Sequence, residues 1–83
     1  MPTVARFGST RAVIYPDDHR PAHVHLVGPD GEAVFDLHCP WGPPELRASM
    51  GYSLTRINRH ARMLQTGLRG LCHHWSAIHG DDC

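Results

Sequence analysis

The first half of the chain consists of short runs in which apolar and polar residues alternate, the period of half-buried β-strands. Turn-forming residues, among them Gly8-Ser9 and the stretch 28–31, separate these runs. We therefore predict four strands, over residues 3–7, 10–15, 22–27 and 32–38. Prolines and acids make residues 16–21 a loop, and the prolines at the start of residues 40–52 predict a second, longer loop.

The second half has the period of an amphipathic helix. Apolar residues recur at alternating spacings of three and four: Leu54, Ile57, Ala61, Leu64, Leu68, Leu71, Trp75 and Ile78. This pattern predicts one long helix over residues 53–79, capped by Ser53 and stopped by Gly80. Gly67 and Gly70 are poor helix formers, so either the helix breaks near Gly67 or part of it extends past the sheet and needs another surface, such as a second copy.

Together these elements predict a single α+β domain over residues 1–83. It has a four-stranded antiparallel sheet made of two hairpins, and the amphipathic helix packs on the apolar face of the sheet. At 83 residues the chain has room for one small core only.

The second predicted hairpin determines where several histidines lie. A turn at residues 29–30 pairs apolar with apolar residues: Ala22 with Leu37, Val24 with Phe35 and Leu26 with Ala33. The opposite face then places His23 across from Asp36 and His25 across from Val34. His38 lies farther along the same face, and His19 can reach it from the preceding loop.

This polar face has three interpretations. It can be a solvated surface. It can be an acid–base site, in which His23, His25 and Asp36 act on a phosphodiester without a metal while His19, Arg20 and His38 hold the substrate. It can also be a metal site, with zinc or another first-row divalent ion held by His23, His25, Asp36 and His38.

Charge is unevenly distributed although the formal net charge is zero. Residues 1–45 contain three arginines and six acids, whereas residues 46–79 contain five arginines and no acid. The arginines of the predicted helix face are Arg56, Arg59, Arg62 and Arg69. Such a face is commonly just solvated, but it also suits an RNA backbone or an acidic partner protein.

The cysteines and the hydropathy of the chain indicate in which cellular compartment the protein is expected. The chain has three cysteines, Cys39, Cys72 and Cys83, without a paired or zinc-finger spacing, and this favours a reducing cytoplasm. No apolar run is long enough for a membrane span, and the first residues lack the apolar core of a secretory signal. We therefore expect a cytoplasmic protein that does not contact a membrane.

Several motifs resemble one family over nearly the whole chain. The most specific is Asp18-His19-Arg20-Pro21-Ala22-His23-Val24-His25, which has the form D-H-x-P-x-H-x-H. Other matching segments are Met1-Pro2-Thr3-Val4, Arg6-Phe7-Gly8, Val13-Ile14-Tyr15, Glu32-Ala33-Val34-Phe35, Gly51-Tyr52-Ser53 and Trp75 with His79. Together they resemble the small bacterial proteins of domain of unknown function family 4160.

The resemblance implies a short antiparallel sheet with a C-terminal helix. It also implies a gene beside that of another small protein, in an arrangement like a toxin–antitoxin pair. The chain departs from the family in its helix, where such proteins usually carry several acids and this one has none. A partner contact that depends on those acids is therefore not expected here.

The leading hypothesis is a component of a toxin–antitoxin-like pair that acts on RNA through His23, His25 and Asp36, with a small cognate protein as partner. The alternatives are a non-catalytic interaction module or helix-mediated homodimer, and a small metal-binding protein that uses the same histidines.

Overall fold

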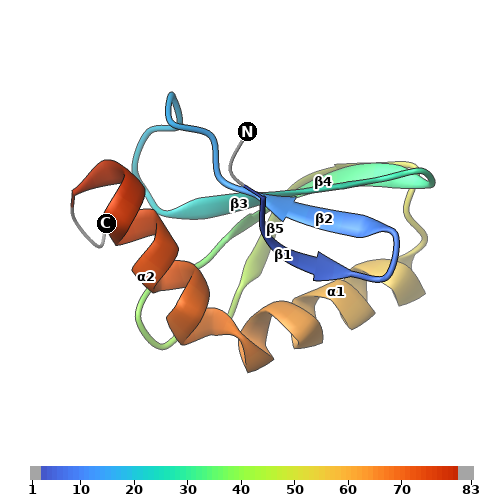
Figure 1. Cartoon of the computed structure of the whole chain (residues 1–83). Helices are drawn as coiled ribbons and strands as arrows, with labels where there is room; N and C mark the ends of the chain where they lie inside the picture. Colours follow the sequence, from blue (N-terminus) through green and yellow to red (C-terminus); the bar gives the residue numbers. More distant parts are fainter. Residues whose placement is uncertain (1–2, 81–83) are drawn as a thin grey trace.

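The computed structural model describes residues 3–80, and its first half is an antiparallel sheet in which every strand neighbours the next in sequence. The five strands are β1 (Thr3–Phe7), β2 (Thr10–Val13), β3 (His23–Gly28), β4 (Gly31–Asp36) and β5 (Glu45–Met50). The second half forms two helices, α1 (Leu54–Thr66) and α2 (Leu68–His79). In Figure 1, α1 lies below the sheet and α2 rises at its left end.

The α+β class and the antiparallel sheet are confirmed, but the predicted count of four strands and one helix is wrong. The additional strand is β5, which lies inside the segment predicted as a loop over residues 40–52. All six of its residues are exposed, and β5 is one of the two outer strands of the sheet. The strand follows the prolines on which the loop prediction rested.

The helix breaks at Gly67, one of the two outcomes that the sequence allowed. The Gly67 N–H donates to the carbonyl oxygen of Met63 and closes α1, and α2 starts at the next residue. The predicted N-cap is present, since the Ser53 Oγ accepts a hydrogen bond from the Arg56 N–H. A break lets both helices stay against the sheet, which is much shorter than one straight helix of that many residues.

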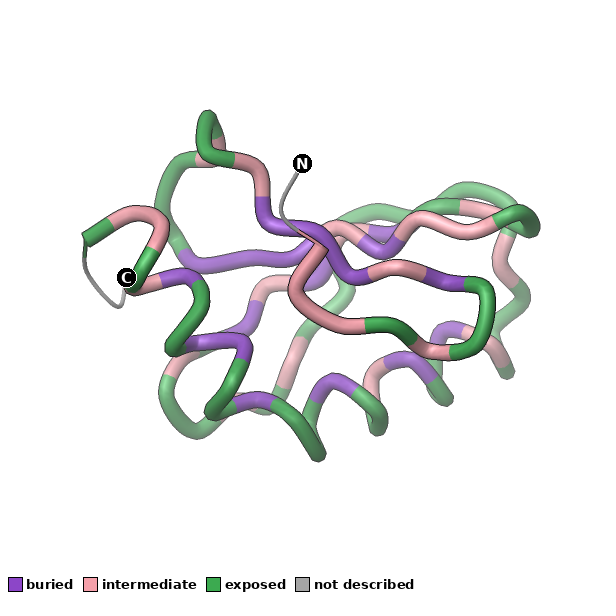
Figure 2. Tube along the Cα trace, in the orientation of Figure 1, coloured by how far each residue is buried: buried purple, intermediate pink, exposed green. Residues whose placement is uncertain are grey.

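The core lies between the helices and one face of the sheet. Trp75, Phe35 and Ile14 are its largest fully buried side chains. From the predicted stripe, Ile57, Leu64, Leu68, Leu71 and Trp75 are buried, and Ala61 and Ile78 pack against them. Leu54, the first stripe residue, is 75% exposed. In Figure 2 the buried segments of both helices recur along the side that faces the strands.

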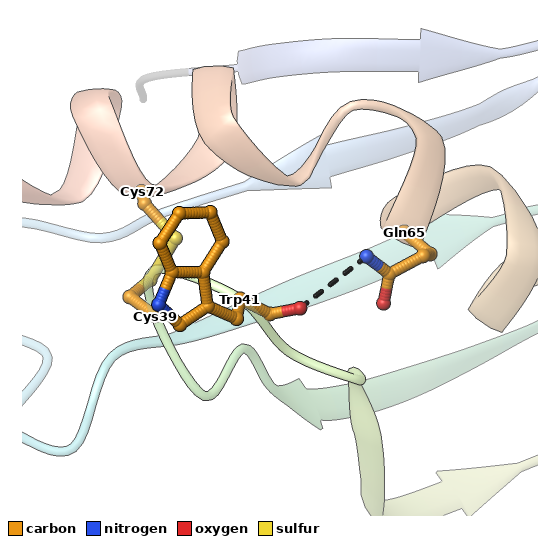
Figure 3. The surroundings of a disulfide bond; sticks show 4 residues. All are labelled: Cys39, Trp41, Gln65 and Cys72. Carbon is orange, nitrogen blue, oxygen red and sulfur yellow. Dashed lines mark hydrogen bonds between the residues drawn. A yellow bond between two sulfur atoms is a disulfide. The ribbon is translucent and has the colours of Figure 1, made fainter.

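A disulfide between Cys39 and Cys72 ties the β4–β5 connection to α2 (Figure 3). The two residues are 33 positions apart in sequence, so their spacing gave no indication of the pair. Disulfides persist mainly in oxidising environments, and the cysteines therefore no longer support the expectation of a reducing cytoplasm. Among residues 3–80, neither helix has the length and apolar character that crossing a membrane requires.

Candidate metal centre

His23 and His25 lie on the same face of β3, as the hydrophobic pattern predicted. The register pairs His23 with Asp36, Val24 with Phe35 and His25 with Val34, so this prediction is confirmed at each position. The intervening Val24 belongs to the core under the helices. The two histidines therefore lie on the sheet face away from α1.

The connection between β2 and β3 supplies a carboxylate to these histidines. In Figure 1 this connection rises on the side of the sheet away from α1. The backbone N–H of Tyr15 donates to the Asp18 Oδ2 at 3.0 Å, and the Asp18 N–H donates to the Tyr15 carbonyl oxygen, also at 3.0 Å. These two bonds fix the turn and leave the Asp18 Oδ1 to face the imidazoles.

The Asp18 Oδ1 lies 3.2 Å from the His25 Nε2 and 3.5 Å from the His23 Nε2. One donor atom from each of the three residues lies within 4.8 Å of the other two. The site is only partly covered, because the side chains of His23 and Asp18 are 6% and 13% exposed whereas that of His25 is 26% exposed. Access from solvent is therefore past His25.

The hydrogen bond made by the other nitrogen of His23 determines what its Nε2 can do. The His23 Nδ1–H donates to the Pro21 carbonyl oxygen at 2.8 Å. A carbonyl oxygen only accepts, so in the neutral ring the single proton is on Nδ1 and the Nε2 presents a lone pair. That lone pair faces the Asp18 Oδ1, an arrangement that favours a cation between them.

Aromatic rings hold the two imidazoles in place. The Tyr15 ring packs edge-on against His25, with 4.8 Å between centroids, and His23 and His25 are 5.3 Å apart. On its other side His23 contacts Trp75 of α2, again at 5.3 Å. Packing on both sides restricts rotation of the rings and preorganises the donor atoms.

The structure does not bring Asp36 and His38 into this donor set. Asp36 accepts a hydrogen bond from Arg47, and the His38 Nε2 lies 3.0 Å from the Glu45 Oε1. Asp36, His38 and Glu45 form a second group of possible ligands, but His38 and Glu45 are exposed. Because Arg47 already neutralises Asp36, this second group is the weaker site for a cation.

The remaining predicted site residues, His19 and Arg20, are exposed parts of the same β2–β3 connection. His19 makes no hydrogen bond or ion pair with another residue of the described part of the chain. The carboxylate that does approach the histidines, Asp18, was missed as a site residue. Asp18 is the first residue of the D-H-x-P-x-H-x-H motif. Its place in that motif was the one indication in the sequence that it belongs to the site.

The arginines of the helices lie elsewhere. Arg56 donates to the Asp30 Oδ2 at 3.2 Å and lies over the Tyr52 ring. Arg59, Arg62 and Arg69 are exposed, and within residues 3–80 none of their guanidinium groups forms an ion pair. Since α1 covers the opposite face of the sheet from His25, its arginines cannot assist chemistry at the histidines.

No protein-family model, curated protein or solved structure matches the chain. The likeness to domain of unknown function family 4160 therefore stays a prediction.

Proposed function

We propose that this protein binds a first-row divalent metal ion, with zinc as the reference case, through Asp18, His23 and His25. The observation that carries the proposal is the spacing of the donor atoms. In a tetrahedral zinc site with bonds of about 2.0–2.1 Å, neighbouring donors are about 3.4 Å apart. The Asp18 Oδ1 lies 3.2 Å and 3.5 Å from the two imidazole nitrogens.

The hydrogen bonds made by the other polar atoms of His23 and Asp18 favour a bound metal over a simple ion pair. A metal-bound histidine commonly donates its other N–H to a carbonyl or carboxylate, as His23 does to Pro21. The second oxygen of Asp18 is held by the Tyr15 N–H, which favours binding through the Oδ1 alone. Two imidazoles and one carboxylate suit zinc, iron or manganese.

Three protein ligands leave at least one coordination position for water, the arrangement of catalytic rather than structural zinc sites. Solvent reaches this position past the half-buried His25. A metal there would act as a Lewis acid and lower the pKa of bound water. The residues around it would exclude bulk water on the side where His23 meets Trp75.

Titration of the untagged protein with zinc chloride by isothermal calorimetry tests the proposal. We expect one site in the parent chain, and an affinity lower by more than about 100-fold in Asp18→Ala, because a direct ligand matters more than the outer contacts that change affinity 10–100-fold. Asp36→Ala is the matched control and should bind as the parent does, since Asp36 pairs with Arg47. Circular dichroism confirms that each variant is folded.

Two results would refute this assignment. The first is the absence of zinc binding by the parent chain. The second is a loss of affinity in Asp36→Ala as large as that in Asp18→Ala, which would favour the ligand set with Asp36 that the sequence predicted.

The hypothesis of metal-free acid–base chemistry on RNA, within a toxin–antitoxin-like pair, stays a prediction. Burial weakens it, because His23 is 5% exposed and has little surface through which to exchange a proton with a bulky substrate. A single short RNA also cannot contact His25 and the α1 arginines together, since they belong to opposite faces of the sheet.

A further inference from the structure

A groove runs between the edge strand β1 and the two helices. Two adjoining cavities, of about 250 and 120 Å³, form it and share Phe7 and Met63. The first is lined by Phe7, Gly8, Arg56, Arg59, His60 and Met63. The second adds Val4, Ala5, Gly67, Gly70, Leu71 and His74. We call the whole feature the β1 groove.

One wall of the β1 groove is an open sheet edge. The strand order places β1 at the end of the sheet, with β2 as its one strand partner in the described chain. The outer backbone N–H and C=O groups of an edge strand can pair with another extended chain. A groove between such an edge and a helix is the geometry in which an extended peptide adds as a further strand.

Two glycines line the β1 groove: Gly67, where the helix breaks, and Gly70 within α2. Gly70, inside α2, destabilises that helix by roughly 1 kcal/mol relative to alanine. A Cβ at Gly67 or at Gly70 would meet no atom within 4 Å, so packing inside the fold does not require glycine at either position. Both residues line the groove, and the missing side chains keep it open to an outside group.

Charge differs between the ends of the β1 groove. Arg56 and Arg59 border the end at Phe7, where Arg56 already pairs with Asp30 and Arg59 pairs with no described residue. The helices contain no acidic residue. The other end, near Val4 and Leu71, has mainly apolar walls. The groove therefore complements a segment with an acidic end and apolar side chains.

We propose that the β1 groove binds an extended, acidic-ended peptide segment of a partner protein, which pairs with β1 as a sixth strand. In the antiparallel orientation its N-terminal acidic residues meet Arg59, and its alternate apolar side chains contact Val4, Met63 and Leu71. Hydrogen bonds between the peptide backbone and β1 supply affinity. The contact of the acidic residues with Arg59 sets the register of the peptide along β1. Single-stranded RNA fits less well, because Phe7 is the one aromatic ring of the groove besides the imidazoles of His60 and His74.

This inference does not depend on the metal proposal. The β1 groove is formed by β1 and the helices, whereas the metal ligands come from β3 and the β2–β3 connection. Asp18→Ala should therefore leave peptide binding unchanged.

Fluorescence polarisation tests the proposal with a labelled peptide of two aspartates followed by alternating valine and serine. A peptide with two lysines in place of the aspartates is the comparison. We expect the parent chain to bind the acidic peptide about tenfold more tightly than the basic one. We expect Arg59→Glu to reverse this preference, a result that loss of folding cannot produce.

Gly70→Leu fills the floor of the β1 groove and should weaken binding of the acidic peptide by about tenfold or more. Ala77→Leu is the matched control, because Ala77 is exposed on α2 and does not line the groove. Equal binding by both leucine variants, or an unchanged charge preference in Arg59→Glu, would overturn the proposal. So would a labelled single-stranded oligouridylate that binds the parent and loses affinity in Gly70→Leu, since it would identify a nucleic-acid site.

Discussion

His60 is a buried side chain without a polar partner. It is 4% exposed, both ring nitrogens are buried, and neither forms a hydrogen bond with the described residues. Its ring packs edge-on against Tyr52, 4.8 Å away. Burial lowers the pKa of His60 below 6.5, and the neighbouring charges of Arg56 and Arg59 lower it further. At neutral pH the ring is therefore an uncharged packing element.

Replacing His60 with leucine should increase the free energy of unfolding at pH 7. The change removes two buried polar atoms that have no partner and keeps an apolar group of similar size, so we expect a gain of about 1–2 kcal/mol. Urea denaturation measures it. A loss of stability would show that the imidazole makes a favourable interaction within the fold.

The same residue predicts part of the pH dependence of stability. Because the folded-state pKa lies below 6.5, the unfolded chain takes up a proton first as the pH falls. The free energy of unfolding should therefore fall as the pH drops from about 6.5 through the folded-state pKa. In His60→Leu this contribution is absent, so its stability should change less over that interval than the stability of the parent. Equal slopes in the two proteins would contradict the assignment.

At the residue scale, the alternation of apolar and polar residues predicted on which face of the sheet each strand side chain lies. It did not predict which loop side chain approaches that face. The alternation of apolar residues placed His23 and His25 on one face because a shift by one residue would have exposed Val24 and Phe35. No such periodicity governs residues 14–22. The approach of Asp18 depends on hydrogen bonds with the Tyr15 backbone, which no spacing rule indicates.

At the scale of the elements, the sequence predicted the helices more completely than the strands. The spacing of Ile57, Leu64 and Trp75 predicted the buried side correctly, and Gly67 was the predicted point of a break. Strand β5 did alternate, with Leu46, Ala48 and Met50 between polar residues. Its pairing with β4 contains an irregularity next to Val34, and the prolines before it obscured where the strand begins.

Substituting alanine at two glycines of the helical half should have opposite effects. Gly70→Ala should raise the free energy of unfolding by about 1 kcal/mol, since Gly70 is helical and a Cβ there meets no atom. Gly80→Ala should lower it by about 1–2 kcal/mol, because Gly80 ends α2 at a φ of +87°. Thermal unfolding measures both, and a destabilising Gly70→Ala would show that the glycine is needed for the fold itself.

At the scale of the whole molecule, the Cys39–Cys72 bond connects the sheet to α2 across the chain (Figure 3). A small domain has a thin core and gains much from such a link. Neither the composition nor the cysteine spacing could predict the bond, because it depends on how α2 returns to the β4–β5 connection. Because two of the cysteines are paired, cysteine usage no longer supports the cytoplasmic compartment that the sequence favoured.

Opening this bond should lower the free energy of unfolding by about 3–4 kcal/mol, as expected for a loop of this length. We expect a reducing agent to lower the melting temperature of the parent chain and to leave that of the Cys39→Ser, Cys72→Ser double variant unchanged. A parent chain that melts at the same temperature with and without the reducing agent would contradict the prediction.

The central claim is that Asp18, His23 and His25 form one metal site across the β2–β3 connection and the sheet. The most direct measurement is anomalous X-ray diffraction at the zinc edge from crystals of the untagged protein grown with zinc. We predict an anomalous peak within about 2.0–2.2 Å of one oxygen of Asp18 and of the Nε2 atoms of both histidines. A peak at Asp36, His38 and Glu45 instead, or no peak in well-ordered crystals, would contradict it.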